Sequence, residues 1–172
     1  PNLKIAATAA TAPAKVMRKG DQIKFLSAVR AVQNGVFRMS PEIPGLVEAS
    51  TNLAKITLAH GQLTIGSLQR SSVESSKSDV AAAFRAPFEL LGAKVELANE
   101  YPGWKPNPSS KIVQKMAGIY KTMFGDAPVI EACHAGLECG IIGQAYPGLD
   151  MVSFGPTIVG PHSPDEKASI SS

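Results

Sequence analysis

The chain has 172 residues, of which 44% are hydrophobic and 18% are charged, so it can bury a core and is not expected to be disordered. Its formal net charge of +3 comes from scattered Lys and Arg residues, with no basic stripe interleaved with aromatic residues, which argues against a nucleic-acid partner. No apolar run approaches the roughly 20 residues that a membrane span needs, and the low cysteine content favours a cytoplasmic location.

The first part of the chain predicts a helix, a β-hairpin, a second helix and a further strand. Apolar residues recur at helical spacing after Asp21, which can cap the first helix. His60 and Gly61 form a candidate tight turn between two strand-like segments. The predicted elements are helix 21–33, loop 40–45, strands 47–58 and 64–70, helix 76–91 and strand 93–101.

The stretch YPGWKPNPSS, residues 101–110, is rich in Pro and Gly and is the best candidate for a linker. The sequence therefore predicts a mixed α/β chain with two parts, residues 1–101 and 102–172. Two strands are too few for an independent sheet, so we expect strands from outside this chain beside the second part. After the linker the predicted elements are a helix ending at Gly125, strand 128–133, a helix or tight loop over 136–143, strand 150–155 and a loop over 156–166.

The stretch EACHAGLECGIIG gathers four side chains of kinds that bind metals: Cys133, His134, Glu138 and Cys139. The C-x5-C spacing is not that of a zinc finger, no second pair completes four ligands, and C-x-x-C is absent. The two cysteines are therefore interpreted as small buried residues without a mutual disulfide. His134 and Glu138 follow a predicted strand, where α/β sheets bind ligands, with a core histidine as the alternative for His134.

His162 lies in a loop between Pro161 and Pro164, and this stiff backbone can hold a metal-binding side chain in one direction. A merely solvated loop histidine is the alternative. Asp165 and Glu166 could orient the ring of His162 through its other nitrogen, or they are ordinary surface charges.

Arg70 is the third candidate, because it ends the second strand of the predicted hairpin and precedes two serines. A strand-end arginine can clamp a carboxylate through two parallel hydrogen bonds. An ordinary surface arginine is the alternative.

Four stretches, in order along the chain, resemble the aminoacyl-histidine dipeptidases: NGVFRMSPEIPGLVEASTNLAKI, YPGWKPN, HAGLECG and AYPGLDMVSFGPTIVGPHSPDE. These Xaa-His dipeptidases are relatives of the carnosinases among the co-catalytic zinc peptidases. The resemblance implies hydrolysis of dipeptides with a C-terminal histidine, in a catalytic α/β domain that holds two zinc ions. It also implies a smaller α+β lid domain, inserted into the catalytic domain, that mediates dimerisation.

The resemblance gives roles to the residues singled out above. His162 in GPHSP corresponds to the last zinc ligand of the family, and Arg70 in LQRS to an arginine that grips the terminal carboxylate of the substrate. HAGLE falls where relatives have a Gly-rich substrate loop, so His134, Gly136 and Glu138 are expected to bind the substrate.

The resemblance assigns residues 1–101 to the later portion of a ferredoxin-like β-β-α-β lid/dimerisation domain, and residues 102–172 to the C-terminal portion of the α/β catalytic domain. The His-x-Asp and Glu-Glu motifs, which hold the other ligands and the base, are absent. We therefore expect a C-terminal fragment of a cytoplasmic homodimer, without a catalytic residue of its own, with zinc absent or partial, and inactive alone. The alternative is a non-catalytic dimerisation or interaction module.

Overall fold

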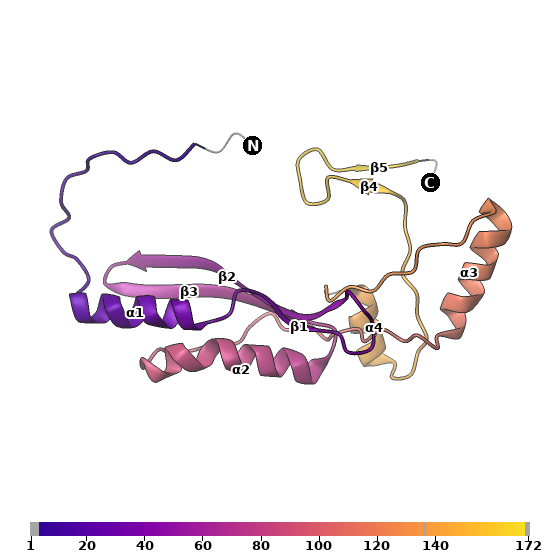
Figure 1. The fold of residues 1–172 in the computed structure, drawn as a ribbon, viewed down its shortest axis with the longest axis horizontal. Coiled ribbons are helices and arrows are strands. Elements are labelled where there is room, and N and C mark those ends of the chain that lie inside the picture. The colour runs from indigo at the N-terminus through magenta and orange to yellow at the C-terminus, as the bar shows by residue number, and fades with distance from the viewer. Residues whose placement is uncertain (1–3, 136, 171–172) are drawn as a thin grey trace.

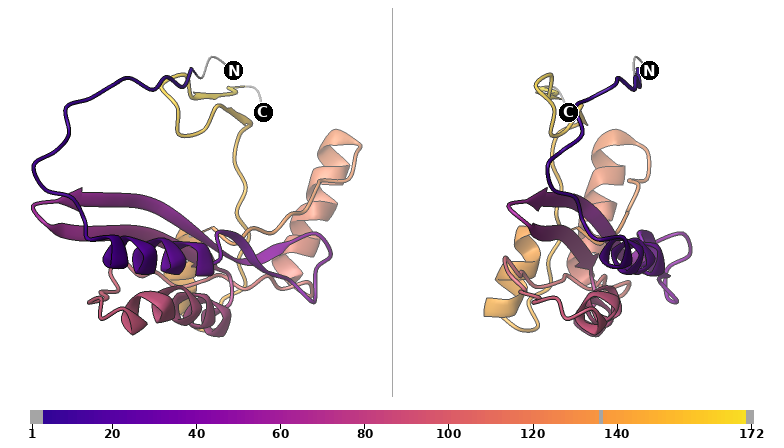
Figure 2. Two further views of the ribbon diagram at one scale, coloured as in Figure 1. Left: turned by 60° about the vertical axis from the view of Figure 1, so that its left-hand side comes forward. Right: turned by 90° about the vertical axis from the view of Figure 1, so that its left-hand side faces the viewer.

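A computed structural model describes residues 4–135 and 137–170. Its largest unit is a three-stranded antiparallel sheet of order β1-β2-β3. Helices α1 and α2 lie along one face of this sheet, and the short helix at residues 138–145 lies on the other side, near the base of the ribbon (Figures 1 and 2). The elements are α1 (Lys19–Ala31), β1 (Gly35–Met39), β2 (Val47–Ala59), β3 (Gln62–Ser71) and α2 (Glu74–Leu90).

The β2–β3 hairpin is a long ribbon that closes at His60 and Gly61. Both residues have positive φ, 52° and 76°, as the two central residues of a type I′ turn require. Ala54 interrupts the ladder, because Leu53 pairs with Ser67 while Lys55 already pairs with Gly66. This β-bulge shifts the register of β2 by one residue between the tip and the base of the ribbon.

The core lies between the two helices and the sheet. Ala28 of α1 packs with Phe84 and Phe88 of α2, whose ring centroids are 5.5 Å apart. Leu53 and Ile65 contribute the sheet side of this cluster. Burying such side chains stabilises the fold by roughly 1.5–3 kcal/mol each, so this cluster fixes both helices on the same face.

After the linker the chain forms α3 (Lys111–Phe124), α4 (Glu138–Ala145) and a small hairpin of β4 (Ile158–Val159) and β5 (Lys167–Ala168). Ser110 caps the start of α3, and its hydroxyl accepts a hydrogen bond from the Val113 amide at 3.1 Å. The Asp150 carboxylate accepts a bond from the Ile112 amide at 3.0 Å, which ties the segment after α4 to the same helix end. The pKa of Asp150 is lowered by hydrogen bonds from Ser110 and from Ile112.

The predicted mixed α/β class is confirmed, as are the three predicted helices and the β2–β3 hairpin, and the segment left open as a helix or a tight loop forms α4. The third strand of the sheet is β1, which the sequence did not indicate, and the predicted strand 93–101 does not form. Segments 128–133 and 150–155 also form no strand, and several of their large apolar side chains are exposed, as at Val129, Ile130 and Phe154. A strand needs a hydrogen-bonded neighbour, and no described strand lies beside these segments.

No helix in the described part of the chain combines the length and the apolar character needed to cross a membrane.

Candidate functional site

Ser50 and Arg70 form a cross-strand pair at the base of the β2–β3 ribbon. Their neighbours Thr51 and Gln69 are also paired, and the Gln69 amide donates a hydrogen bond to the Thr51 hydroxyl at 3.2 Å. Thr51 lies among residues of α2, such as Val80, around a small, partly open hollow of about 160 Å³. Because side chains alternate along a strand, Ser50 and Arg70 lie on the opposite face, away from α1 and α2.

His134 lies against this pair, although 84 residues separate it from Ser50 along the chain. The Nε2 atom of His134 is 2.8 Å from the Ser50 hydroxyl. Burial and the positive charge of Arg70 both lower the pKa of His134 below its ordinary value of 6.5, so the ring is neutral at pH 7. Two residues singled out from the sequence, Arg70 and His134, are thus brought together, and Ser50 joins them.

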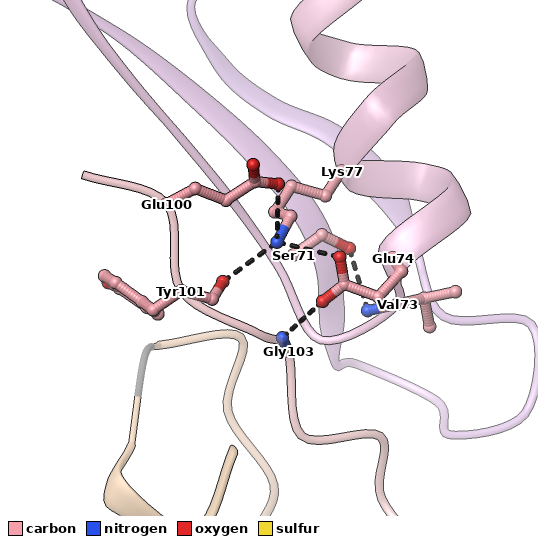
Figure 3. A network of polar contacts seen from close by, with 7 residues as sticks. All are labelled: Ser71, Val73, Glu74, Lys77, Glu100, Tyr101 and Gly103. Carbon is pink, nitrogen blue, oxygen red and sulfur yellow. Dashed lines mark hydrogen bonds and ion pairs between the residues drawn. The ribbon is translucent and has the colours of Figure 1, made fainter. Parts of the chain in front are cut away.

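The linker is held against the start of α2 by a polar network (Figure 3). The Lys77 ammonium forms ion pairs with Glu74 at 2.8 Å and Glu100 at 3.2 Å, and it donates a hydrogen bond to the Tyr101 carbonyl at 2.8 Å. The Glu74 carboxylate accepts a bond from the Gly103 amide at 2.6 Å. The hydrogen bond from Lys77 holds the pKa of Glu74 below its ordinary value, so this carboxylate is charged at neutral pH.

The same linker also fixes α4, and through it the loop that carries His134. A Cβ atom at Gly103 would lie 2.6 Å from the Ser72 carbonyl oxygen, and one at Gly140 would lie 2.5 Å from the Pro102 carbonyl oxygen. Only glycine allows backbones to approach this closely. The contacts therefore run from β3 through the linker to α4, and they set where His134 meets the sheet.

Glu138 is the first residue of α4, and its side chain is exposed. It lines an open hollow of about 230 Å³ together with Tyr101, Leu137 and Ile141. Gly136, which was expected to bind the substrate, lies outside the described residues.

Cys133 and Cys139 are both free, which confirms the prediction that they form no disulfide. The interpretation of both as buried residues is wrong, since Cys133 is exposed and Cys139 is only partly buried. The predicted strand before Cys133 does not form, so no sheet covers that thiol.

His162 lies in the exposed loop between β4 and β5, a hairpin that stands apart from the three-stranded sheet (Figures 1 and 2). Its backbone has a φ of 63°, and its amide donates a hydrogen bond to the Glu166 carboxylate at 2.6 Å. The Ser163 hydroxyl donates to the Gly160 carbonyl at 2.7 Å. These bonds fix the course of the loop, and Glu166 supports the backbone of His162 through them.

The described residues do not by themselves fit a resident metal ion. No group of three or more His, Cys, Asp and Glu side chains gathers anywhere in residues 4–135 and 137–170. A tetrahedral or two-metal site needs at least three protein ligands. His162 therefore stands here as a single candidate ligand.

Ser50 was missed in the sequence, because a serine inside a strand matches no motif for binding. The hairpin register was the one available signal, since it determines which residue of the first strand lies opposite Arg70. That register depends on the bulge at Ala54, which the alternation of the sequence does not reveal.

Comparisons with known proteins agree with the resemblance seen in the sequence, although no protein-family model matches the chain. The chain is 41% identical over 148 residues to the cytosol non-specific dipeptidase of Escherichia coli K12, covering 86% of this chain and 30% of that protein. It also matches the crystal structure of the aminoacylhistidine dipeptidase from Vibrio alginolyticus, with a TM-score of 0.82 and 44% identity, over 94% of this chain and 33% of that one. The chain is therefore a homologue of these dipeptidases and corresponds to about a third of their length.

Proposed function

We propose that this chain forms the carboxylate-binding part of a dipeptidase that hydrolyses dipeptides with a C-terminal histidine. Its homologues are dipeptidases, and one of them is described as an aminoacylhistidine dipeptidase. The observation that carries the proposal is the meeting of Arg70, Ser50 and His134 on the face of the sheet away from α1 and α2. The activity itself is proposed for the whole protein, because the chain spans only about a third of its relatives.

The charge of this cluster suits the terminal carboxylate of a dipeptide. Arg70 offers a planar set of donors that can bind both oxygens of a carboxylate. His134 is neutral at pH 7, so it adds a hydrogen-bonding group without a second positive charge. The single positive charge of Arg70 then faces the single negative charge of the terminal carboxylate. Glu138, together with Gly136, is proposed to contact the rest of the substrate from the same loop.

We assign residues 1–101 to a lid and dimerisation domain and residues 102–172 to the C-terminal portion of a catalytic domain. His162 is proposed as one ligand of a site for two zinc ions, with the remaining ligands supplied from outside this chain, since the described residues offer no complete set. A cytoplasmic location is proposed because the Escherichia coli relative is a cytosol dipeptidase.

We also propose that the protein forms a homodimer through the lid. Near the base, the Leu53 amide donates to the Asn34 side chain at 2.7 Å, but from Lys55 to Ala59 β2 pairs only with β3 among the described residues and has no strand on its other edge. Ile56 and Leu58 of this half are 44% and 55% exposed. Such an edge can add a strand from a second copy. Sedimentation equilibrium that finds only monomers at all concentrations would count against this assignment.

A chimera tests the activity directly. In it, this chain replaces the matching segment of the Escherichia coli dipeptidase, which supplies the other two thirds of the protein. We expect the chimera to hydrolyse β-alanyl-histidine and the 172-residue chain alone to show no turnover, because the latter lacks the His-x-Asp and Glu-Glu motifs. Robust hydrolysis by the chain alone, or a folded, metal-loaded chimera without activity, would refute the proposal.

Arg70→Ala in the chimera is expected to lower kcat/KM for β-alanyl-histidine by about 10- to 100-fold, mainly by raising KM. The reason is the loss of a charge-assisted hydrogen bond worth roughly 1.5–3 kcal/mol. For the substrate with an amidated C-terminus, Arg70→Ala should lower kcat/KM only a little, because the carboxylate that Arg70 would bind is already absent. Arg38→Ala is the matched control, because Arg38 is also a strand arginine but pairs with Asp79 of α2 at 3.5 Å. Equal losses for the free and the amidated substrate would make Arg70 a structural residue.

A further inference from the structure

Ser50 and His134 form a side-chain contact that no motif in the sequence explains. Their hydrogen bond, 2.8 Å long, joins the base of the β2–β3 ribbon to the loop before α4. Ser50 also lies directly opposite Arg70 in the ladder. The Nε2 atom of His134 is therefore occupied by Ser50, which leaves Nδ1 as the ring atom available to a ligand.

A neutral imidazole carries one proton, and the partner of one nitrogen decides which nitrogen holds it. If the Ser50 hydroxyl donates to Nε2, the proton sits on Nδ1 and can be donated to an anion. If Nε2 carries the proton and donates to Ser50, then Nδ1 presents a lone pair, which repels a carboxylate. A hydroxyl can play either role, but only the arrangement in which Ser50 donates leaves Nδ1 with a proton to give to an anion.

We propose that Ser50 is a positioning residue that holds His134 in the Nδ1–H tautomer, so that His134 and Arg70 donate together to one carboxylate. This inference rests on the proposed function, in which that carboxylate is the C-terminus of the dipeptide. The contact also fixes the ring against the sheet, so the donor is in place before the ligand arrives and less conformational entropy is lost on binding.

The charges around the ring are consistent with this role. Burial disfavours the doubly protonated ring of His134, and the positive charge of Arg70 adds to this effect, so both lower its pKa. In an imidazolium Nε2 could no longer accept a hydrogen bond from Ser50. When the ring is neutral and Ser50 donates to Nε2, the ring still has an N–H group at Nδ1. His134 and Arg70 can then both donate to the same carboxylate while the Ser50 contact is kept.

The first test uses the 172-residue chain labelled with ¹⁵N-histidine, with N-acetyl-histidine as the probe and its C-terminal amide as the control. Long-range ¹H–¹⁵N spectra at pH 7.5 report the tautomer of each ring, and His60 and His162 serve as exposed internal references. We expect His134 to be Nδ1-protonated with N-acetyl-histidine bound. Ser50→Ala should shift it toward Nε2–H, the tautomer that an unconstrained histidine side chain prefers, and Ser50→Thr should restore Nδ1–H.

An Nε2–H tautomer for His134 in the wild-type chain with N-acetyl-histidine bound would overturn the inference, and so would an unchanged tautomer in Ser50→Ala under the same conditions. In the chimera, Ser50→Ala should raise KM for β-alanyl-histidine roughly two- to tenfold with kcat nearly unchanged, and Ser50→Thr should recover most of this loss. For the amidated substrate, KM should be the same in the unchanged chimera, in Ser50→Ala and in Ser50→Thr. An inactive chimera would contradict the proposed function, while the tautomer in the chain alone decides the role of Ser50.

Discussion

Replacing Gly103 by alanine is expected to lower the free energy of unfolding by about 2–3 kcal/mol, because the new methyl group would overlap backbone atoms. The added Cβ would lie 2.6 Å from the Ser72 carbonyl oxygen and 2.8 Å from the Ser71 carbonyl oxygen. Backbone cannot move aside as the end of a long side chain can. The linker must therefore shift, and the hydrogen bond from Gly103 to Glu74 is lost with it.

Thermal and urea unfolding of the 172-residue chain measure this effect, with an expected fall in Tm of about 5–10 °C. Gly118→Ala is the matched control, because Gly118 lies inside α3 and an added Cβ meets nothing within 4 Å there. That change should stabilise the helix by roughly 0.5–1 kcal/mol. Unfolding of Gly103→Ala indistinguishable from that of the unchanged chain would mean that the linker does not lie against β3 as described.

Replacing His162 by alanine in the chimera is expected to remove one of two metal ions and nearly all activity, while the fold remains intact. The reason is that His162 is the chain's proposed ligand, and the loss of one ligand from a two-metal site leaves an ion without its coordination. Elemental analysis of the purified variant gives the metal content, and turnover of β-alanyl-histidine gives the activity. Two zinc ions per chain with near-normal turnover would contradict the assignment and make His134 the next histidine to test.

His60→Ala provides the control for the His162 variant. Both histidines are exposed residues in hairpin loops, with φ values of 52° and 63°. Both histidines already carry a Cβ atom at a positive φ, so the same change to alanine alters the backbone equally little at each position. The difference between the two variants therefore isolates the loss of a ligand. His60→Ala should keep both metal ions and its activity.

The helices and the hairpin could be predicted because their signals are local. Gly125 marks the end of α3, where it has a φ of 84°. Gly61 likewise marks the hairpin turn. These elements satisfy their backbone hydrogen bonds within one short segment, so sequence patterns suffice to find them.

The sequence patterns failed mainly for strands that depend on distant partners. Segment 93–101 alternates as a strand should, yet no neighbouring strand is available to it, and β1 forms because β2 lies beside it despite a weak pattern. The candidate site likewise depends on contacts between segments that are far apart in the sequence. Arg70 and His134 were each singled out, but their meeting through Ser50 depends on the docking of the linker and α4, which no local pattern records.

The bulge at Ala54 has a consequence for which side chains share a face. Ile56 is paired with Ile65, a core residue, and so faces the helices. Counting back from Ile56 in steps of two would turn Ser50 toward the helices as well, away from Arg70. The single extra residue reverses the alternation, so that Ser50 faces the ligand side of the sheet. One inserted alanine thus decides whether the hydroxyl that holds His134 is present on that surface at all.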